Sequence, residues 1–328
     1  MDRDRETFYE KLNLENFLDF YNSFESVKEL IGFMRSRKSP EIRTFKVQSD
    51  TETQIVAVIP TKSTESEHVK VLTEKLKGIN IILVESRGPF FNFSLSMNAG
   101  IKEAIRLNSK FIMLSNDDIF PLDSVKTLQK AIMEKNVDYD LFVPRIMNDH
   151  SYLSPNQTIY TQSWLTKHIV SSNVMSFVNH FRVSESPRTL LGKLKIYRSS
   201  DILKYIVLRD QDPIFKKDHG KLISHIMELS VKKINKPLIE ITNVQPVSII
   251  RTEILKYEKF DESFVNGGED TDLSIRLAIK GIKVGELEER FQNIGGYSLG
   301  NTIERILKNT IPEVLILGYK LNQYFQSY

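Results

Sequence analysis

Residues 111–118 read Phe111-Ile112-Met113-Leu114-Ser115-Asn116-Asp117-Asp118, and this stretch decides the predicted fold. Four apolar residues followed by polar ones are typical of a short strand that is buried on both faces. Asp117 and Asp118 then stand at the carboxyl end of that strand, where open α/β sheets bind ligands. Two adjacent carboxylates repel each other at neutral pH unless a cation or a hydroxyl-rich ligand lies between them. The alternative role for this pair is that of ordinary turn and helix-capping residues.

Strand and helix patterns alternate on both sides of this stretch. Each strand is a short apolar run, and each helix repeats its apolar residues at intervals of three and four. This alternation is typical of a parallel sheet with helices on both faces. The predicted fold class is therefore α/β, with a mostly parallel Rossmann-like sheet sandwiched by helices. The predicted strands of this region are residues 55–60, 79–84, 111–114 and 140–144.

Length and composition narrow the possible function classes. The chain has 328 residues, and its hydrophobic and charged fractions of 41% and 27% are those of an ordinary globular protein. The net charge of +3 is too small to predict a nucleic-acid partner. No apolar run approaches the length of a membrane span, and the first residues do not resemble a signal peptide, so we expect a cytoplasmic protein. The absence of cysteine excludes disulfides and thiolate metal sites.

A second polar stretch, Gly267-Gly268-Glu269-Asp270-Thr271-Asp272, precedes an apolar pattern that predicts a helix. The two glycines allow a tight turn and the close approach of a ligand. Capping and the helix dipole account for one or two carboxylates at a helix N-terminus, but not for three. An acid that is held in the first turn and faces a cleft is well placed to take a proton from a hydroxyl group.

Taken together, these segments resemble a known family, the family-2 glycosyltransferases with the A-type fold. The segments that look like the donor half of that family are residues 55–61 ending on Pro-Thr, Val84-Glu85-Ser86, Asn98-Ala99-Gly100-Ile101 and residues 114–118. Residues 260–264, followed by residues 268–277, look like its acceptor-side signature. The motifs occur in the order and at the intervals of that family, and the resemblance covers about residues 54–144 and 244–298.

The resemblance implies transfer of a sugar from a nucleotide-diphosphate sugar, with UDP or dTDP favoured, to a hydroxyl acceptor. Asp118 would bind Mn²⁺ or Mg²⁺ at the donor diphosphate, and Asp117 would reach the ribose or share the metal. Glu85 matches the acid that pairs with the nucleobase in that family. The donor-binding residues that the resemblance implies are Thr61, Glu85, Arg87, Asn98 and Asp117.

On the acceptor side, the resemblance makes Asp270 the general base that deprotonates the acceptor hydroxyl, with inversion at the anomeric carbon. Glu269 would orient the acceptor or tune that base. The acceptor would be a glycan or a lipid-linked or protein-linked hydroxyl. For Glu85 and Arg87 the alternative role is a loop ion pair.

The sequence departs from the family at two positions that keep an alternative open. The nucleobase acid is usually Asp, and Glu85 is one methylene longer. Where the family often has a histidine ligand, this chain has Gln292 and Asn293. The alternative is a catalytically silent module that binds a nucleotide or a glycan. A third possible function, that of a nucleotidyltransferase, would require a glycine-rich loop with a basic residue after the first strand. The corresponding segment, Thr61-Lys62-Ser63-Thr64, has no glycine, which argues against this function.

The chain divides into five predicted segments. Residues 38–51, which follow the predicted N-terminal helices, read as a linker or an edge segment. The five are an N-terminal helical extension (1–50), a nucleotide-sugar-binding half (54–144), an inserted, basic, helical acceptor region (145–240), an acceptor and catalytic half (241–300) and a C-terminal amphipathic helix (301–328).

Two of these segments have alternative interpretations. Residues 150–237 contain fourteen Lys or Arg against six Asp or Glu, and this excess fits either a solvated helical insertion or a surface for an anionic or carbohydrate acceptor. In the second case Trp164, Tyr152 and Tyr160 would stack on sugar faces. The C-terminal helix either docks on the core or makes peripheral contact with a membrane that carries a lipid-linked acceptor.

Overall fold

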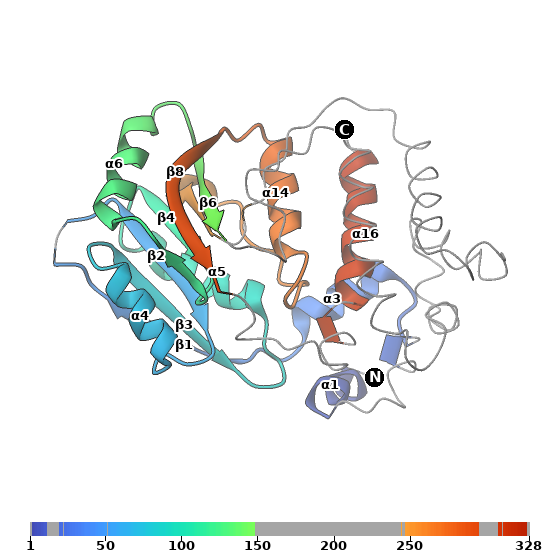
Figure 1. Cartoon of the computed structure of the whole chain (residues 1–328). Coiled ribbons are helices and arrows are strands. Elements are labelled where there is room, and N and C mark those ends of the chain that lie inside the picture. The colour runs from blue at the N-terminus through green and yellow to red at the C-terminus, as the bar shows by residue number, and fades with distance from the viewer. Residues whose placement is uncertain are drawn as a thin grey trace, which may run out of the picture.

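The computed structural model describes residues 2–11, 20–21, 23–50, 52–147, 244, 247–294, 308–309 and 311–326. The predicted basic insertion at 145–240, with Trp164, Tyr152 and Tyr160, lies outside the described residues apart from its first three positions. The described part is an α/β structure whose strands form one sheet covered by helices, and the helices from the two ends of the chain lie beside that sheet (Figure 1).

The sheet has eight strands in the described part of the chain and curls into a half-barrel. Their spatial order is β1-β3-β2-β4-β7-β6-β8-β5. The bounds are β1 (Glu41–Val47), β2 (Ile55–Thr61), β3 (Asn80–Arg87), β4 (Phe111–Ser115), β5 (Ile119–Pro121), β6 (Leu141–Met147), β7 (Val247–Arg251) and β8 (Val284–Asn293). β1 lies at the sheet edge, so the second of the two interpretations of residues 38–51 is confirmed.

The sheet is mixed and mostly antiparallel, so the predicted mostly parallel Rossmann-like sheet of the A-type glycosyltransferase fold is wrong. Only the β3-β2-β4 unit and the β6-β8 pair are parallel. β7 follows residues 148–243 in the sequence, and it lies antiparallel between β4 and β6. The apolar runs predict which strands are buried on both faces, but burial does not fix which strand lies beside which.

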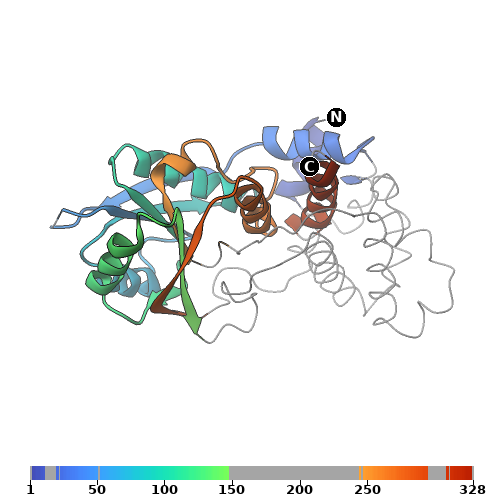
Figure 2. The ribbon, with the colours of Figure 1, turned by 90° about the horizontal axis from the view of Figure 1, so that it is seen from above.

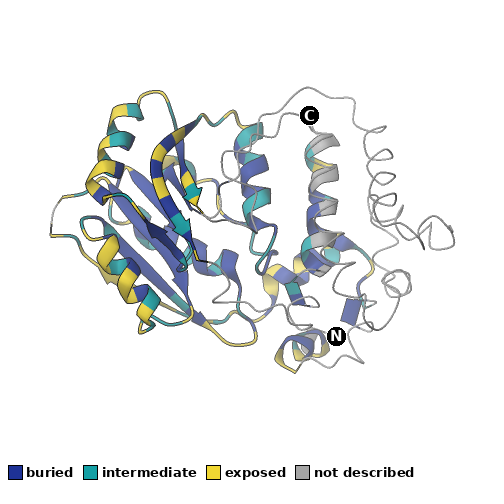
Figure 3. Cartoon of the chain, viewed as in Figure 1, coloured by how far each residue is buried: buried dark blue, intermediate teal, exposed yellow. Residues whose placement is uncertain are grey.

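Apolar side chains pack beneath helices on both faces of the sheet. Alternate residues of β2 point to opposite faces, as the two-residue repeat of a strand requires. One face is covered by α4 (Glu67–Lys75) and α6 (Val125–Lys135). The other is covered by α5 (Phe93–Ile105), α13 (Thr252–Leu255) and α14 (Glu269–Ile279). Figure 2 shows these helices on the two sides, and Figure 3 shows the buried strands between exposed helix surfaces.

Two strands escaped the sequence analysis. β8 is ten residues long, and the charged Glu and Arg residues at its alternate positions interrupt the apolar pattern that predicts buried strands. Its other positions are buried, so it is a strand with one polar face. β5 pairs antiparallel with the end of β8, through Ile119 opposite Asn293. This pairing places the end of β8 directly beside Asp118, whose carbonyl accepts a hydrogen bond from the Ile294 amide at 3.1 Å.

Helices from both ends of the chain lie together beside the sheet (Figure 1). They are α1 (Asp2–Glu10), α3 (Val27–Ser36) and α16 (Ile311–Gln326). α3 ends ahead of Pro40, as expected from the proline. Lys308 Nζ donates to the Tyr9 carbonyl at 2.7 Å, which joins the two ends of the chain directly.

α16 docks through a buried face. Ile316, Leu317 and Lys320 on this helix are all buried. The docking interpretation of the C-terminal helix is supported by this burial, and contact of its remaining surface with a membrane stays a prediction. In the described part of the chain, no helix combines the length and the apolar character needed to cross a membrane.

Candidate functional site

Thr61 and Asp117 meet at one edge of the sheet. Thr61 ends β2 and Asp117 follows β4, and these two strands are adjacent and parallel, so their carboxyl ends lie together. Thr61 Oγ1 donates to Asp117 Oδ2 at 2.8 Å, and both side chains are buried. A carboxylate that is buried and hydrogen-bonded is held in one orientation, as a ligand-binding group requires. The structure thus brings two of the predicted donor residues into contact.

His68, on α4, belongs to the same cluster. Its Nε2 lies 3.3 Å from Asp117 Oδ2 and 3.5 Å from the Ser66 hydroxyl. The sequence analysis gave no role to this histidine, because no metal-ligand spacing singles it out. The only available signal was its place at the start of the helix after β2, which brings it over the edge where β2 and β4 end.

Asp118 is half-buried next to this pair. Burial raises the pKa of Asp118, and the neighbouring charge of Asp117 raises it further. Asn293, which the sequence places where the family often has histidine, is buried at the end of β8 and lies on the strand paired with residues 119–121. Asp118 and Asn293 therefore flank one point of the sheet edge.

The two adjacent acids fit a hard divalent cation only if other groups complete its coordination. No group of three or more His, Asp or Glu side chains in the described residues is placed to hold a metal. Mg²⁺ and Mn²⁺ characteristically use one or two carboxylates together with waters and substrate phosphates. Burial first, and the neighbouring Asp117 charge second, disfavour the ionised form of Asp118, and a bound cation would favour that form. Asp117 and Asp118 therefore fit a metal that is shared with a diphosphate.

Glu85 and Arg87 lie at the end of β3, and Glu85 is directly opposite Thr61 in the parallel pairing. Glu85 accepts hydrogen bonds from the Thr64 amide at 3.0 Å and forms an ion pair with Arg87 at 3.1 Å. The Thr64 amide hydrogen bond, ahead of the Arg87 charge, lowers the pKa of Glu85 although burial opposes it. Arg87 Nε also donates to the Lys62 carbonyl at 2.9 Å. Both side chains therefore brace the loop after β2.

Asn98 joins α5 to the loop that precedes the acidic motif. Its Nδ2 donates to the Phe260 carbonyl and to Glu262 Oε1, both at 2.9 Å, and its Oδ1 accepts from the Phe260 amide at 3.0 Å. These hydrogen bonds place the predicted donor residue against the 260–264 loop rather than at the Thr61–Asp117 contact. Asn98 thus positions one motif against the other.

The three carboxylates of the second motif have different surroundings. Glu269 is buried and accepts a hydrogen bond from the Gly267 amide, so it closes the turn into α14. Gly268 caps that helix with φ of 80°, a backbone conformation that favours glycine. Asp272 is fully buried and is compensated by Arg276 and Lys320, with Nζ of Lys320 at 2.8 Å. Glu269 and Asp272 are therefore structural in this arrangement.

Asp270 is the motif carboxylate that remains partly exposed, in the first turn of α14. The Thr271 hydroxyl lies 3.4 Å from its Oδ1. Its backbone carbonyl accepts a hydrogen bond from Ser274 Oγ at 2.6 Å, and that oxygen in turn accepts from the Val244 amide at 3.1 Å. Asp270 therefore combines a fixed backbone with a side chain that is partly exposed.

Ser274 connects this turn to the sheet edge at which the predicted donor residues Thr61 and Asp117 lie, which we call the donor edge. Val244 lies three residues before β7, and the first residue of β7, Val247, pairs with Ser115 at the end of β4. Ser115 precedes Asp117 by two residues, so both acidic motifs are attached to the same edge of the sheet. The sequence analysis missed Ser274, because nothing local distinguishes a serine inside a helix that bonds a residue thirty positions away.

Asp261, on the same loop as Glu262, was also missed. It is bound by Arg35 from α3, with Nε at 3.0 Å, and by Lys320 from α16. Burial raises the pKa of Asp261, but the Arg35 hydrogen bond and the Lys320 charge outweigh burial and hold that pKa well below its usual range. The N-terminal and C-terminal helices are thus tied to the loop beside the acidic motif.

Comparison with known proteins adds no relative to this description. The sequence matches no protein-family model, and no curated protein matches it significantly.

Proposed function

We propose that this protein is an inverting, metal-dependent glycosyltransferase that moves a sugar from a nucleotide-diphosphate sugar to a hydroxyl acceptor. One observation carries the proposal. The hydrogen bonds of Ser274 and the β4–β7 pairing attach the turn that holds Asp270 to the strand end that holds Asp117 and Asp118. A donor-binding acid pair and a partly exposed acid at one sheet edge are what transfer between two substrates requires.

The donor end of the proposed site is built from Thr61, Asp117 and Asp118. The Thr61 hydroxyl fixes Asp117, which leaves the second carboxylate oxygen to bind the donor ribose or a metal. Asp117 and Asp118 would hold Mn²⁺ or Mg²⁺, which when bound offsets the negative charge that grows on the departing diphosphate. Glu85 and Arg87 shape the wall beside the nucleobase through the loop after β2.

At the acceptor end, Asp270 takes the proton of the attacking hydroxyl. The acceptor oxygen forms a bond to the anomeric carbon, while the bond from that carbon to the diphosphate oxygen breaks. The nucleoside diphosphate leaves with the bonding electron pair, and the sugar is inverted at the anomeric carbon. The hydrogen bonds of Ser274 and the Gly267-Gly268 turn hold the Asp270 backbone still during this step.

Replacement of the base tests the proposal. Asp270→Asn preserves the size of the side chain but cannot accept the proton, so nucleoside diphosphate release from the donor should fall by at least about 100-fold. Donor binding, measured by calorimetry, should remain close to that of the wild type. The exposed Glu286 on β8 offers a matched control, and Glu286→Gln should leave turnover unchanged. Equal turnover in wild type and Asp270→Asn would remove Asp270 from this role.

The second candidate is a catalytically silent module that binds a nucleotide or a glycan. It is favoured by Glu85, whose carboxylate is already bonded to Thr64 and Arg87, and by Asn293 beside Asp118. The same experiment separates the two functions. A protein that binds a nucleotide but releases no nucleoside diphosphate from any nucleotide sugar, with a range of acceptors, would fit the silent module.

A further inference from the structure

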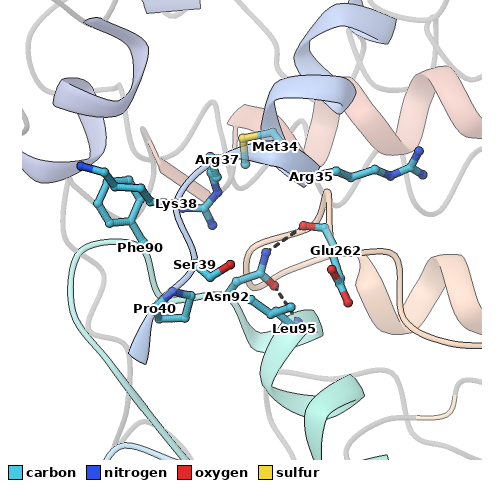
Figure 4. A pocket seen from close by; sticks show the side chains of 10 residues that line it. All are labelled: Met34, Arg35, Arg37, Lys38, Ser39, Pro40, Phe90, Asn92, Leu95 and Glu262. Atoms are coloured by element: carbon cyan, nitrogen blue, oxygen red, sulfur yellow. Dashed lines mark hydrogen bonds between the residues drawn. The ribbon is translucent and has the colours of Figure 1, made fainter. Parts of the chain in front are cut away.

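A small pocket lies between the end of α3 and the start of α5, apart from the donor edge (Figure 4). Its lining comes from the segment after α3, from the α5 N-terminus and from the 260–264 loop. The side chains that matter for its chemistry are Arg37, Ser39, Asn92, Leu95 and Glu262. Neither the donor edge nor the turn of Asp270 contributes a residue to the lining.

Arg37 is the unusual member of this pocket. Only 6% of its surface is exposed, yet no described carboxylate pairs with it. Its Nη2 donates to the Phe91 carbonyl at 3.3 Å, and the guanidinium lies 4.6 Å from the ring centre of Tyr9. Nε and Nη1 have no hydrogen-bond partner. A buried charge with two unused donors is costly, and such groups normally have an anionic partner.

The other cations of the pocket are already neutralised. Arg35 pairs with Asp261, and Lys38 pairs with Glu10 at 2.9 Å. Figure 4 shows the head groups of Arg35 and Lys38 pointing away from the pocket on opposite sides, while the Arg37 guanidinium points towards Ser39 and Asn92. Arg37 is therefore the cation that the described lining presents to a ligand.

A helix N-terminus lies across the pocket from Arg37. α5 is thirteen residues long, and its N-cap Asn92 accepts a hydrogen bond from the Leu95 amide at 2.9 Å. The Phe93 amide also donates, to the Val265 carbonyl at 2.6 Å, so it is the helix dipole that favours an anion at this position. Glu262 is the one carboxylate of the described lining, and its negative charge disfavours an anion in the pocket. Asn98 Nδ2 donates to Glu262 Oε1 at 2.9 Å, and the Glu262 carboxylate points away from Arg37 in Figure 4.

We propose that this pocket binds a phosphate group, with the Arg37 guanidinium as its charged contact, the Ser39 hydroxyl as a further donor and the dipole of α5 favouring the anion. A guanidinium presents its N–H groups as planar forks that match phosphate oxygens, and each of the two edges of Arg37 has one nitrogen, Nε or Nη1, without a partner. A phosphate at one of these edges would supply the missing anionic partner and lower the cost of the buried charge. Binding would also stabilise the packing of α3 on α5, since residues of both helices line the pocket.

The test measures binding of inorganic phosphate and of glycerol phosphate to the full chain. Calorimetry should show saturable binding of at least one of the two, and that compound should raise the melting temperature with the same concentration dependence. Binding of inorganic phosphate alone would identify free phosphate as the ligand, and stronger binding of glycerol phosphate would identify a phosphomonoester. Absence of saturable heat with both compounds would overturn the proposal.

Two variants separate specific binding from the general stabilisation that phosphate salts give to folded proteins. Arg37→Met keeps the bulk of the side chain and should lose the saturable binding, and Arg37→Lys should weaken it at least about tenfold because the fork is lost. Arg43, an exposed residue of β1 that pairs with Glu41, provides the matched control, and Arg43→Met should bind like the wild type. Unchanged binding in Arg37→Lys or in a folded Arg37→Met would contradict the assignment. Asp118→Asn should bind phosphate normally, so this result is independent of the proposed transferase activity.

Discussion

At the scale of single residues, the acidic motif at 269–272 shows how three carboxylate side chains acquire different roles within a single helical turn. Glu269 bonds the turn that precedes it, and Asp272 is sealed in an ion-pair network. Asp270 retains solvent access between them. The difference follows from the helical repeat, because residues two positions apart face opposite sides of the helix. Of the three carboxylates, only that of Asp270 is therefore partly exposed.

Asp261 gives the clearest pH prediction. The pKa of its carboxyl is lowered in the folded protein, so its contribution to the free energy of unfolding is complete above the unfolded pKa of about 3.9. That contribution is lost as the pH falls below this value towards the lowered pKa. Asp261→Asn should therefore reduce stability at pH 7 by about 1.5–3 kcal/mol, because hydrogen bonds to charged groups are lost. It should also lose less stability than the wild type on acidification.

Urea unfolding at neutral and acidic pH measures both effects. Asp123 is the control, since its ion pair joins it to Arg290, whose side chain is largely exposed. Asp123→Asn should change stability little at either pH. Equal stability of wild type and Asp261→Asn at pH 7, or the same loss on acidification, would show that Asp261 does not anchor the terminal helices.

Residue-level prediction from the sequence worked where chemistry is local. The carboxylate pair at a strand end predicted the edge at which Thr61, Asp117 and Asp118 now lie. His68 and Ser274 were missed because their partners are far away in the sequence. A pattern of nearby residues cannot reveal such contacts, since only the folded chain brings the partners together.

At the scale of elements, periodicity located most helices and the buried strands, and it failed for β8. The alternating charges of this strand gave no apolar run, although its buried positions follow a strict two-residue repeat. β5, only three residues long, was not predicted, because its position depends on pairing with β8. A strand this short has too few residues to show a period of its own.

The packing of α5 on the sheet yields a prediction about Gly100. A Cβ at this position would lie 2.3 Å from Val58 Cγ1 and 2.7 Å from Val84 Cγ2, on two neighbouring strands. Both methyl groups belong to stiff, β-branched side chains in the core, so neither moves aside easily. Gly100→Ala should lower the free energy of unfolding by about 1–3 kcal/mol.

Gly32 on α3 is the matched control, because a Cβ there meets nothing within 4 Å. Gly32→Ala removes backbone freedom from the unfolded chain and should raise stability by about 0.5–1 kcal/mol. The two variants should thus change the urea midpoint in opposite directions. A stabilising Gly100→Ala would mean that α5 does not pack tightly on β2 and β3.

At the scale of the whole molecule, the sequence predicted an α/β protein but not the order of its strands. The β3-β2-β4 unit is the parallel arrangement that strand and helix alternation implies. β7 breaks the pattern, because it arrives after residues 148–243 and pairs antiparallel with strands on both sides. That insertion of one strand brings Val244, and with it α14, to the edge where β4 ends.

Helices from both ends of the chain contact the loop and the helix beside this edge. Arg35 from α3 and Lys320 from α16 both bind Asp261, and Lys320 also binds Asp272 within the acidic motif. Burial raises the pKa of the Tyr324 hydroxyl, and the charge of Asp272, to which it donates at 2.6 Å, raises it further. The terminal helices therefore support the helix that carries Asp270, although neither belongs to the segments on which the proposed function rests.

The measurement that tests the central claim most directly is a thermal-shift panel of UDP, dTDP, GDP and CDP, each with and without Mn²⁺. Wild type, Asp118→Asn and the control Asp123→Asn are compared. A ligand that binds only the folded state stabilises it by about 2.7 kcal/mol at one hundred times its Kd. The account predicts that one nucleotide raises the melting temperature by several degrees in wild type and Asp123→Asn, only with Mn²⁺, and that Asp118→Asn loses this shift. No shift with any nucleotide, or a shift that needs neither Mn²⁺ nor Asp118, would contradict a metal-dependent nucleotide-sugar site at this edge.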